Sequence, residues 1–227
     1  MNTIVINILC EGQTEERFVK SVLKKHLRAI GLVVKCRLLR AKGGMIGYEQ
    51  VKRDLACWVK ENSWRKGERH YYTTMFDFYA LPKDFPGYTS ADQKQDPYLQ
   101  VETLENAFAQ DLCIPNFIPY IQLHEFEALL FCGIESICEI YPRNRKSICS
   151  LENVLSKEYQ GNPELIDSGA STAPSKRIVA AVEAERRYRY NKPLSAEQVT
   201  AKTGIVKLKR MCRHFREWLE RIESIVS

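Results

Sequence analysis

Apolar residues recur along the chain with two different spacings, which predict strands separated by amphipathic helices. The segment Ile4–Leu9 is a short, β-branched and almost continuous apolar run, a pattern typical of a strand buried on both faces of a parallel sheet. It stops at Glu11-Gly12, where glycine permits a sharp turn. Thr14 then favours the start of a helix. The apolar residues of that helix follow at helical spacing and are Phe18, Val22, Leu23 and Leu27.

The same alternation continues as far as residue 131. Further strands are predicted at Leu32–Leu39, His70–Phe76 and Phe117–Leu123. Amphipathic helices are predicted at Tyr48–Asn62 and Asp96–Leu112, and a helix is expected over His124–Phe131. Residues 1–131 therefore predict an α/β core, a Rossmann-like sheet of about four mostly parallel strands flanked by helices.

The remainder of the chain, residues 132–227, has helical patterns. Asn162–Ser175 is rich in Gly, Ser, Thr and Pro and has the composition of a linker. The capping-box pattern Ser195–Gln198 predicts a short helix that ends at Thr203-Gly204. Ile205–Ile225 predicts a last helix with one apolar face and many basic residues around the other. We therefore expect a helical, basic C-terminal section packed on the core.

Carboxylates follow three of the predicted strands. Glu11 comes after the first strand, Asp77 after the third, and Glu125 and Glu127 after the fourth. The carboxyl ends of parallel strands meet at one edge of a sheet, where open α/β folds bind ligands. Carboxylate oxygens are also the ligands that Mg²⁺ and Mn²⁺ prefer. The spacing predicts catalytic roles for Glu11, Asp77 and Glu125, and it predicts that these three and Glu127 are metal ligands. In the absence of metal, mutual repulsion should raise the pKa of at least one of these carboxyl groups.

Other ionisable residues near these strand ends allow two interpretations. Glu15 and Glu16 fall in the first turn of a helix, where one interpretation is that they merely stabilise the helix dipole. We assign Glu16 to that role and keep Glu15 as a secondary site candidate. His124 is either a core histidine bonded to the backbone or a second secondary candidate. Glu11 differs from these residues, because ending a buried strand on an ionisable group is costly unless that group is solvated, paired or metal-bound.

Two segments are candidate phosphate sites. Arg40–Gly47 is a glycine-rich loop containing Lys42, whose backbone amides could approach a phosphate, although it is not a P-loop and a plain flexible connection is the alternative. Lys176 and Arg177 stand at a predicted helix start with Ser175 as its cap, where a helix N-terminus could receive a phosphate. The alternative for this second segment is a cap with two solubilising charges.

Composition places the chain among ordinary globular proteins. Of its 227 residues, 44% are hydrophobic and 27% are charged. No window approaches a membrane span and the chain starts with a strand pattern, so the expected location is the cytoplasm. The eight cysteines are scattered without a C-x-x-C motif, which favours buried reduced thiols over a disulfide frame or a structural zinc.

The net charge of +6 is unevenly distributed. From Pro174 onward there are 13 Lys and Arg residues against 6 Asp and Glu residues, whereas residues 1–173 have 21 against 22. A neutral or acidic body with a basic C-terminal section suits a protein that holds metal in one part and a polyanion, DNA or RNA, on another. A solvated helix surface is the alternative interpretation.

Five sequence blocks carry a resemblance to a known family. They are CEGQTEERF, FDFYALPKDFPG, PYIQLHEFEALLF, APSKRI and CRHFREWLERI, at residues 10–18, 76–87, 119–131, 173–178 and 212–222. In this order they resemble the bacterial family catalogued as domain of unknown function 4276. The strand–Glu–Gly and strand–Asp pattern also resembles the Toprim fold of topoisomerases, primases and overcoming-lysogenization-defect (OLD) nucleases. The resemblance implies a Toprim-like core and a family often encoded beside AAA-type ATPases in anti-phage or plasmid-linked loci.

One departure from the Toprim pattern leaves two functions open. Toprim proteins typically carry D-x-D after the third strand, but this chain has Asp77-Phe78-Tyr79. Either Glu125 or Glu127 replaces the missing acid, or the site binds metal weakly and is not catalytic. The first alternative predicts a Mg²⁺- or Mn²⁺-dependent phosphodiester nuclease or phosphoryl-transfer effector, in which Glu11 could instead be the general base. The second predicts a non-catalytic binding or regulatory subunit of an AAA-type ATPase with a degenerate Toprim site.

Overall fold

The computed structural model describes residues 2–40, 47–167 and 169–226, which contain an open parallel sheet of five strands. Strand β1 (Thr3–Cys10) lies between β2 (Val33–Leu38) and β3 (Glu68–Asp77). Strand β3 then pairs with the short strands β4 (Phe117–Ile118) and β5 (Ile121–Gln122). Each of these pairings is parallel, so the predicted α/β architecture is confirmed.

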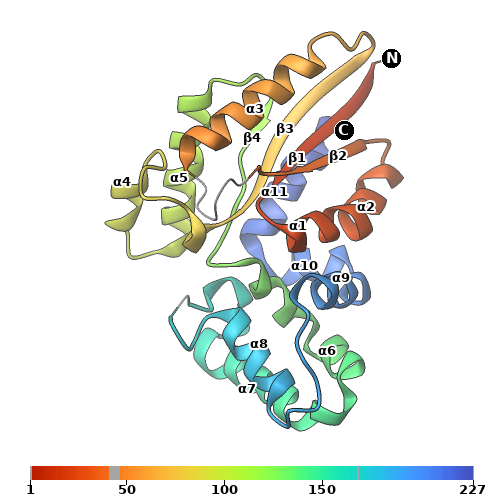
Figure 1. Cartoon of the computed structure of the whole chain (residues 1–227), viewed down its shortest axis with the longest axis vertical. Coiled ribbons are helices and arrows are strands. Elements are labelled where there is room, and N and C mark those ends of the chain that lie inside the picture. Colours follow the sequence, from red (N-terminus) through yellow and green to blue (C-terminus); the bar gives the residue numbers. More distant parts are fainter. Residues whose placement is uncertain (1, 41–46, 168, 227) are drawn as a thin grey trace.

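The sheet separates two apolar clusters, because successive strand residues point to opposite faces. On β1, Ile6, Ile8 and Cys10 enter one cluster, whereas Leu9 enters the other. Helices α3 (Tyr48–Asn62), α4 (Tyr88–Asp92) and α5 (Pro97–Leu112) cover the Leu9 face. The opposite face is covered by α1 (Gln13–Phe18), its π-helical continuation Val19–Leu23, α2 (Lys24–Ala29) and α11 (Arg213–Glu223). Figure 1 shows these layers on the two sides of the sheet.

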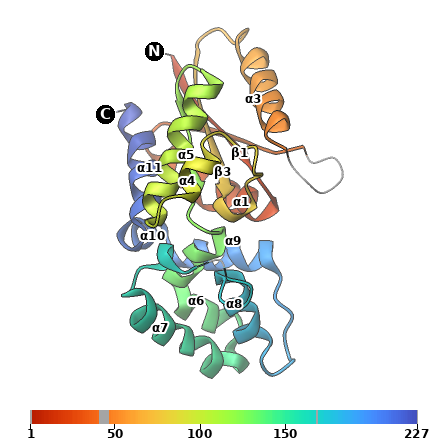
Figure 2. The ribbon, with the colours of Figure 1, turned by 90° about the vertical axis from the view of Figure 1, so that its left-hand side faces the viewer.

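A group of helices lies beyond the carboxyl end of the sheet (Figures 1 and 2). Its helices are α6 (Ile134–Ile140), α7 (Arg145–Tyr159), α8 (Pro174–Glu183), α9 (Lys192–Thr203) and α10 (Ile205–Met211). Short 3₁₀ turns at Phe78–Ala80, Pro142–Asn144, Pro163–Leu165 and Ser224–Val226 join or end the longer elements. Residues of α6–α11 belong to the same apolar cluster as Ile6 and Ile8. The C-terminal section therefore packs on the sheet and shares one hydrophobic core with it. The division between residues 131 and 132 stays a prediction.

The predicted strand Phe117–Leu123 is shorter than expected. Pro119 has no N–H to donate to a ladder, and the strand divides there into β4 and β5. The Thr74 side chain bridges the interruption, because its Oγ1 accepts the Tyr120 N–H at 3.1 Å and donates to the Tyr120 carbonyl at 3.0 Å. The break is thus held by a side chain of the neighbouring strand.

Three helix predictions need correction. The segment after β5 is a 3₁₀ helix over Phe126–Gly133 rather than an α-helix. Helix α9 begins after Asn191, whose Oδ1 accepts the Leu194 N–H at 3.1 Å, so Ser195 is not its cap, although the predicted end at Thr203-Gly204 is confirmed. The expected helix Ile205–Ile225 is interrupted at Cys212, where the backbone is extended.

Two chain-wide expectations can be compared with the described residues. Cys10, Cys132, Cys138 and Cys212 are buried as free thiols, as predicted. Cys57 and Cys113 are exposed, so the prediction of buried thiols is wrong for these two. Within the described ranges, every helix is too short or too polar to cross a lipid bilayer.

Candidate functional site

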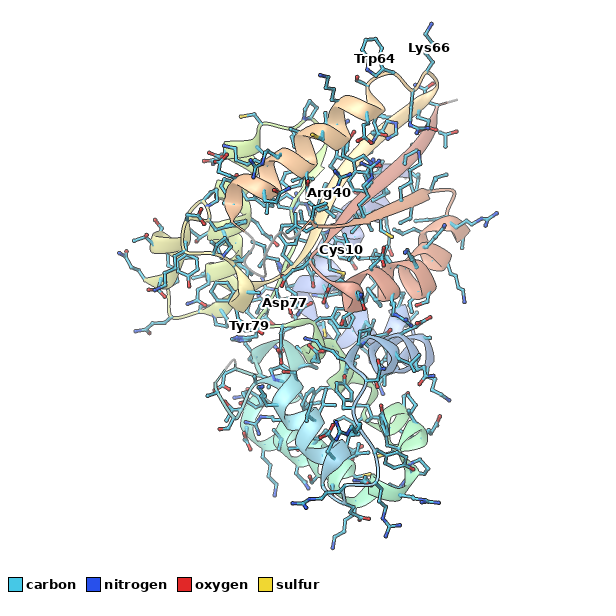
Figure 3. All side chains as sticks on the ribbon, in the orientation of Figure 1. Cys10, Arg40, Trp64, Lys66, Asp77 and Tyr79 are labelled. Atoms are coloured by element: carbon cyan, nitrogen blue, oxygen red, sulfur yellow. The ribbon has the colours of Figure 1, made fainter. Side chains whose placement is uncertain are left out.

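Glu11 and Asp77 meet at the carboxyl edge of the sheet, as their positions after β1 and β3 predict. The register of the two strands places Cys10 opposite Met75, and the Glu11 N–H extends the ladder by donating to the Met75 carbonyl at 3.1 Å. The Asp77 N–H donates to Glu11 Oε2 at 2.9 Å. The two acids are therefore joined directly, and Figure 3 shows Asp77 where the sheet meets the C-terminal helices.

The loop after β5 holds the Asp77 side chain in place. Asp77 is buried, and its Oδ1 accepts the Phe126 N–H at 2.9 Å. The Tyr79 N–H also donates to the His124 carbonyl at 3.2 Å. These two bonds tie the segment after β3 to the segment that carries Glu125 and Glu127.

Ser175 binds Glu125 instead of capping a helix. The first residue outside α8 is Ala173, so the prediction of Ser175 as the cap is wrong. The Ser175 hydroxyl donates to Glu125 Oε2 at 3.0 Å, and the Ser175 N–H donates to Glu125 Oε1. The start of α8 thus donates to a buried carboxylate of the protein itself and fixes its orientation.

Lys192 is the principal feature of the site that the sequence pattern does not reveal. It is the first residue of α9, and its Nζ lies 3.0 Å from Glu127 Oε2. The Glu127 side chain is 0% exposed, and neither of its oxygens accepts a conventional hydrogen bond from the described residues. Lys192 is therefore the counter-ion of a fully buried carboxylate more than sixty positions earlier in the chain.

The electrostatics show an excess of negative charge, carried by Glu11, Glu15, Asp77, Glu125 and Glu127, which we call the acidic cluster. Burial raises the pKa of Asp77 well above its usual value, and the charges of Glu15, Glu11 and Glu127 raise it further. Burial raises the pKa of Glu127 to about 7 despite the opposing effect of Lys192. Burial also raises the pKa values of Glu11 and Glu15. One lysine is too little charge to compensate five acids.

The acidic cluster fits a divalent cation in charge and in ligand type. Carboxylate oxygens suit Mg²⁺ and Mn²⁺, and Glu11 and Asp77 each use one oxygen in a backbone hydrogen bond. The distances between the side chains do not fit an ion, because no three Asp, Glu, His or Cys side chains in the described parts of the chain are close enough together to hold one. A shared metal site therefore stays a prediction, and it requires some of these side chains to move.

Two cavities open beside the acidic cluster. One, of about 730 Å³, is bordered by Glu11, and its other walls are largely apolar, including Val51, Phe76 and Leu81. The other, of about 490 Å³, is bordered by Glu125 and by two lysines, Lys176 and Lys192; we call it the lysine cavity. Asp77, bonded to Glu11 on one side and to Phe126 on the other, lies between them. Glu11 and Glu125 thus face different openings.

The secondary candidates have local partners. Glu15 Oε2 accepts the Gly12 N–H at 2.8 Å, so Glu15 stabilises the turn at the start of α1 as well as contributing charge to the cluster. Glu16 forms an ion pair with Lys20 at 2.7 Å, in keeping with a role on the helix surface. His124 has a positive φ of 59°, and burial lowers the pKa of its imidazole despite the nearby Asp167 and Glu125.

The predicted phosphate ligands differ in their availability. Lys176 is exposed and borders the lysine cavity. Arg177 is engaged elsewhere, since its Nε donates to the Thr172 carbonyl at 2.7 Å and its guanidinium pairs with Glu158 at 3.0 Å. Lys42 lies outside the described residues.

Comparison with known proteins identifies the family. The family described as Domain of unknown function (DUF4276) matches residues 10–223, which include the acidic cluster and Lys192. No curated protein and no solved structure matches the chain. The match extends over nearly the whole sequence, and the chain therefore belongs to the DUF4276 family.

Proposed function

We propose that this protein is a Mg²⁺- or Mn²⁺-dependent phosphodiester nuclease or a related phosphoryl-transfer effector that acts on nucleic acid. The observation that carries the proposal is the acidic cluster, in which burial and mutual repulsion raise the pKa of Asp77 and, among the described residues, Lys192 alone forms an ion pair. A site that is short of positive charge and rich in oxygen ligands binds a cation favourably.

Each residue of the site has its own proposed role in such a reaction. An ion held by the carboxylates of the acidic cluster would supply a Lewis acid, which would polarise the scissile phosphate and lower the pKa of an attacking water. Glu11 and Asp77 are the proposed primary ligands, with Glu125 or Glu127 in place of the missing second aspartate. Lys192 stands between Glu127 and the lysine cavity, where its ammonium can attract a phosphate and stabilise negative charge on it. Glu11 is the alternative general base.

The Toprim resemblance supports the same proposal. Glu11 and Asp77 follow neighbouring parallel strands, β1 and β3, and are bonded to each other. This is the arrangement that a Toprim-like site requires. A role in phage defence or on a mobile element, together with an AAA-type ATPase, belongs to this proposal through the family resemblance alone.

A second function is favoured by the internal partners of the acids. Glu127 already has Lys192 as a counter-ion, and Glu11, Asp77 and Glu125 each accept a backbone N–H. The D-x-D pattern is also incomplete at Phe78-Tyr79. These features suit a non-catalytic subunit that binds or regulates an AAA-type ATPase and keeps a degenerate site.

A cleavage assay with matched variants separates the two functions. The full chain is incubated with single-stranded and duplex DNA and RNA in Mg²⁺, in Mn²⁺ or in EDTA, with and without its ATPase partner. The nuclease proposal predicts cleavage that requires metal, is abolished in Asp77→Asn and is retained in Glu16→Gln, since Glu16 pairs only with Lys20 on the surface. Absence of metal-dependent cleavage under all of these conditions would remove the nuclease proposal in favour of the regulatory subunit.

A further inference from the structure

The lysine cavity has walls from four separate parts of the chain. Tyr79 comes from the turn after β3, Glu125 from the segment after β5, Lys176 from the start of α8, and Tyr190 and Lys192 from the end of the α8–α9 connection and the first residue of α9. Its volume of about 490 Å³ lies in the range that accommodates a small organic ligand or one unit of a polymer. Glu125 borders the same cavity, so a ligand in it touches the acidic cluster.

Tyr79 is an aromatic side chain that the core does not use. It is 61% exposed although it stands only two residues after the buried Asp77, and Figure 3 shows the two side chains close together at the end of the sheet. An exposed aromatic ring beside a cavity is a surface on which a nucleobase can stack, whatever its sequence.

The two lysines place positive charge on the cavity wall. Lys176 is exposed, and its side chain takes part in no hydrogen bond or ion pair within the described parts of the chain. Lys192 pairs with Glu127 on one side and borders the cavity on the other. A phosphate group in the cavity can therefore bind the unpaired Lys176 ammonium and the Lys192 ammonium, which its ion pair with Glu127 already holds in position.

A strip of basic residues continues from the cavity. Arg186, Arg187 and Arg189 are exposed in the α8–α9 connection, whereas the intervening Tyr188 and Tyr190 are half-buried and pack against the core. Only Arg187 forms an ion pair among the described residues, with Glu185 at 3.3 Å. The Tyr190 hydroxyl is buried and has no hydrogen-bond partner in the described ranges. A row of exposed basic residues is typical of surfaces that follow a nucleic-acid backbone.

We infer that the lysine cavity receives one unstacked nucleotide of a single-stranded nucleic acid, with its base against Tyr79 and its phosphates near Lys176 and Lys192. The neighbouring nucleotides follow the arginines of the α8–α9 connection. A base within a duplex is stacked on both sides and cannot reach Tyr79, so the cavity discriminates in favour of single strands. This inference rests on the proposed function for the choice of nucleic acid as the polyanion, and it adds the substrate class.

Binding measured without metal tests the inference independently of cleavage. Short fluorescein-labelled oligothymidylate, oligouridylate and a duplex of equal length are titrated with the full chain in EDTA, and binding is followed by fluorescence anisotropy. We expect both single strands to bind more tightly than the duplex. Tyr79→Ala should weaken single-strand binding roughly tenfold, because stacking on one aromatic ring contributes on that scale, and Tyr79→Phe should retain it.

The controls distinguish the cavity from general charge and folding effects. Trp64→Ala removes an aromatic side chain that is 82% exposed at the far end of the sheet (Figure 3), and it should leave binding unchanged. Lys176→Gln should weaken binding and reduce the slope of log affinity against log salt by about 0.7, the contribution of one phosphate contact on a single strand. Thermal melts of each variant show that the fold is retained.

The outcomes separate this inference from the proposed function. Equal affinity for single strand and duplex, or equal effects of Tyr79→Ala and Trp64→Ala, would overturn the single-strand cavity even if the protein cleaves nucleic acid. Selective, Tyr79-dependent binding in EDTA supports the cavity even if no cleavage is found with metal. Preference for one of the two single strands identifies DNA or RNA as the substrate.

Discussion

Two buried acids in different regions of the molecule, Glu164 beside α11 and Glu127 beside α9, differ in how their oxygens are used. Glu164 is 0% exposed, yet it accepts the N–H groups of His214 and Phe215 and the Tyr98 hydroxyl, each at 3.0 Å. Glu127 is also 0% exposed, but its one partner within the described ranges is the Lys192 ammonium. A buried acid is structural when its oxygens are satisfied by fixed donors, and it suggests a ligand when they are not.

The neighbourhood of Glu164 explains the position of α11. Its carboxylate receives the first amides of that helix just after the extended Cys212, which is where the expected continuous helix is interrupted. Helix amides exposed by the break find a charged acceptor, which is a strong form of helix capping. Trp218 of α11 in turn donates its indole N–H to Thr73 Oγ1 at 2.9 Å and fixes the helix on β3.

The largest expected effect on stability is that of Glu164→Ala. The substitution leaves three donors without this acceptor, the buried Phe215 N–H and the partly buried His214 N–H and Tyr98 hydroxyl, and the loss of an acceptor for a buried donor costs about 1–3 kcal/mol. We expect the free energy of unfolding in urea to fall by roughly 3 kcal/mol or more. Glu102→Ala, at an exposed position on α5, is the control and should change it by less than about 0.5 kcal/mol. A similar small loss for Glu164→Ala would contradict its role as a structural acid.

A smaller effect is expected from Lys192→Gln. This substitution removes the cation that pairs with Glu127 and leaves that carboxylate without its counter-ion among the residues the structure describes. Breaking a fully buried pair costs about 3–5 kcal/mol, but the Lys192 side chain is 42% exposed, and solvent screening reduces the expected loss to about 1–2 kcal/mol. Mn²⁺ should restore more stability to this variant than to the natural protein. Identical Mn²⁺ effects on both would show that the acids do not require a cation.

The smallest expected effect is a pH dependence arising from His214. Its Nε2 lies 3.0 Å from Glu105 Oε1. Burial alone lowers the pKa of the imidazole, but the hydrogen bond and charge of Glu105, together with the charges of Glu164 and Glu217, make the net shift upward. A raised pKa favours the protonated ring in the folded state, so the contribution is complete below the unfolded value of about 6.5 and is lost as pH rises through the folded value.

Urea unfolding as a function of pH measures this contribution. The unfolding free energy of the natural protein should decrease from pH 6 to pH 8 more steeply than that of His214→Gln, by up to about 1 kcal/mol. His26 faces Glu223 at 2.6 Å and is half-buried, and His26→Gln provides a control for a histidine that is less buried than His214. Parallel pH profiles for the natural protein and His214→Gln would show that the Glu105 pair does not titrate in this range.

Local patterns could predict much of this arrangement, but not all of it. The β-branched run of β1 and its abrupt end predict that Glu11 lies at the sheet edge, and two adjacent parallel strands bring Asp77 to the same place. Lys192 could not be found in this way, because its partner, Glu127, is distant in sequence and only the packing of α9 brings them together. The same is true of Glu164, whose role as a cap depends on where α11 begins.

Ser175 shows a second limit of local reasoning. A serine beside Pro174 at a helix start satisfies the pattern of a cap. The helix, however, already begins at Pro174, and the Ser175 hydroxyl donates to Glu125 instead. The Tyr79 side chain likewise lies in a segment that has the composition of a surface loop. Its position next to the lysine cavity follows only from the bond between its N–H and the His124 carbonyl.

Calorimetric titration with Mn²⁺ tests the central claim most directly, namely that the acidic cluster is a cation site and not a set of structural acids. Asp77→Asn removes one charge from the cluster while its amide oxygen can still accept the Phe126 N–H, so the fold should be retained or slightly stabilised. Glu16→Gln alters a surface ion pair beside the same edge of the sheet. We predict that Mn²⁺ binds the natural protein and Glu16→Gln equally and does not bind Asp77→Asn. Equal Mn²⁺ affinity in the two variants, or an unfolded Asp77→Asn protein, would contradict the account.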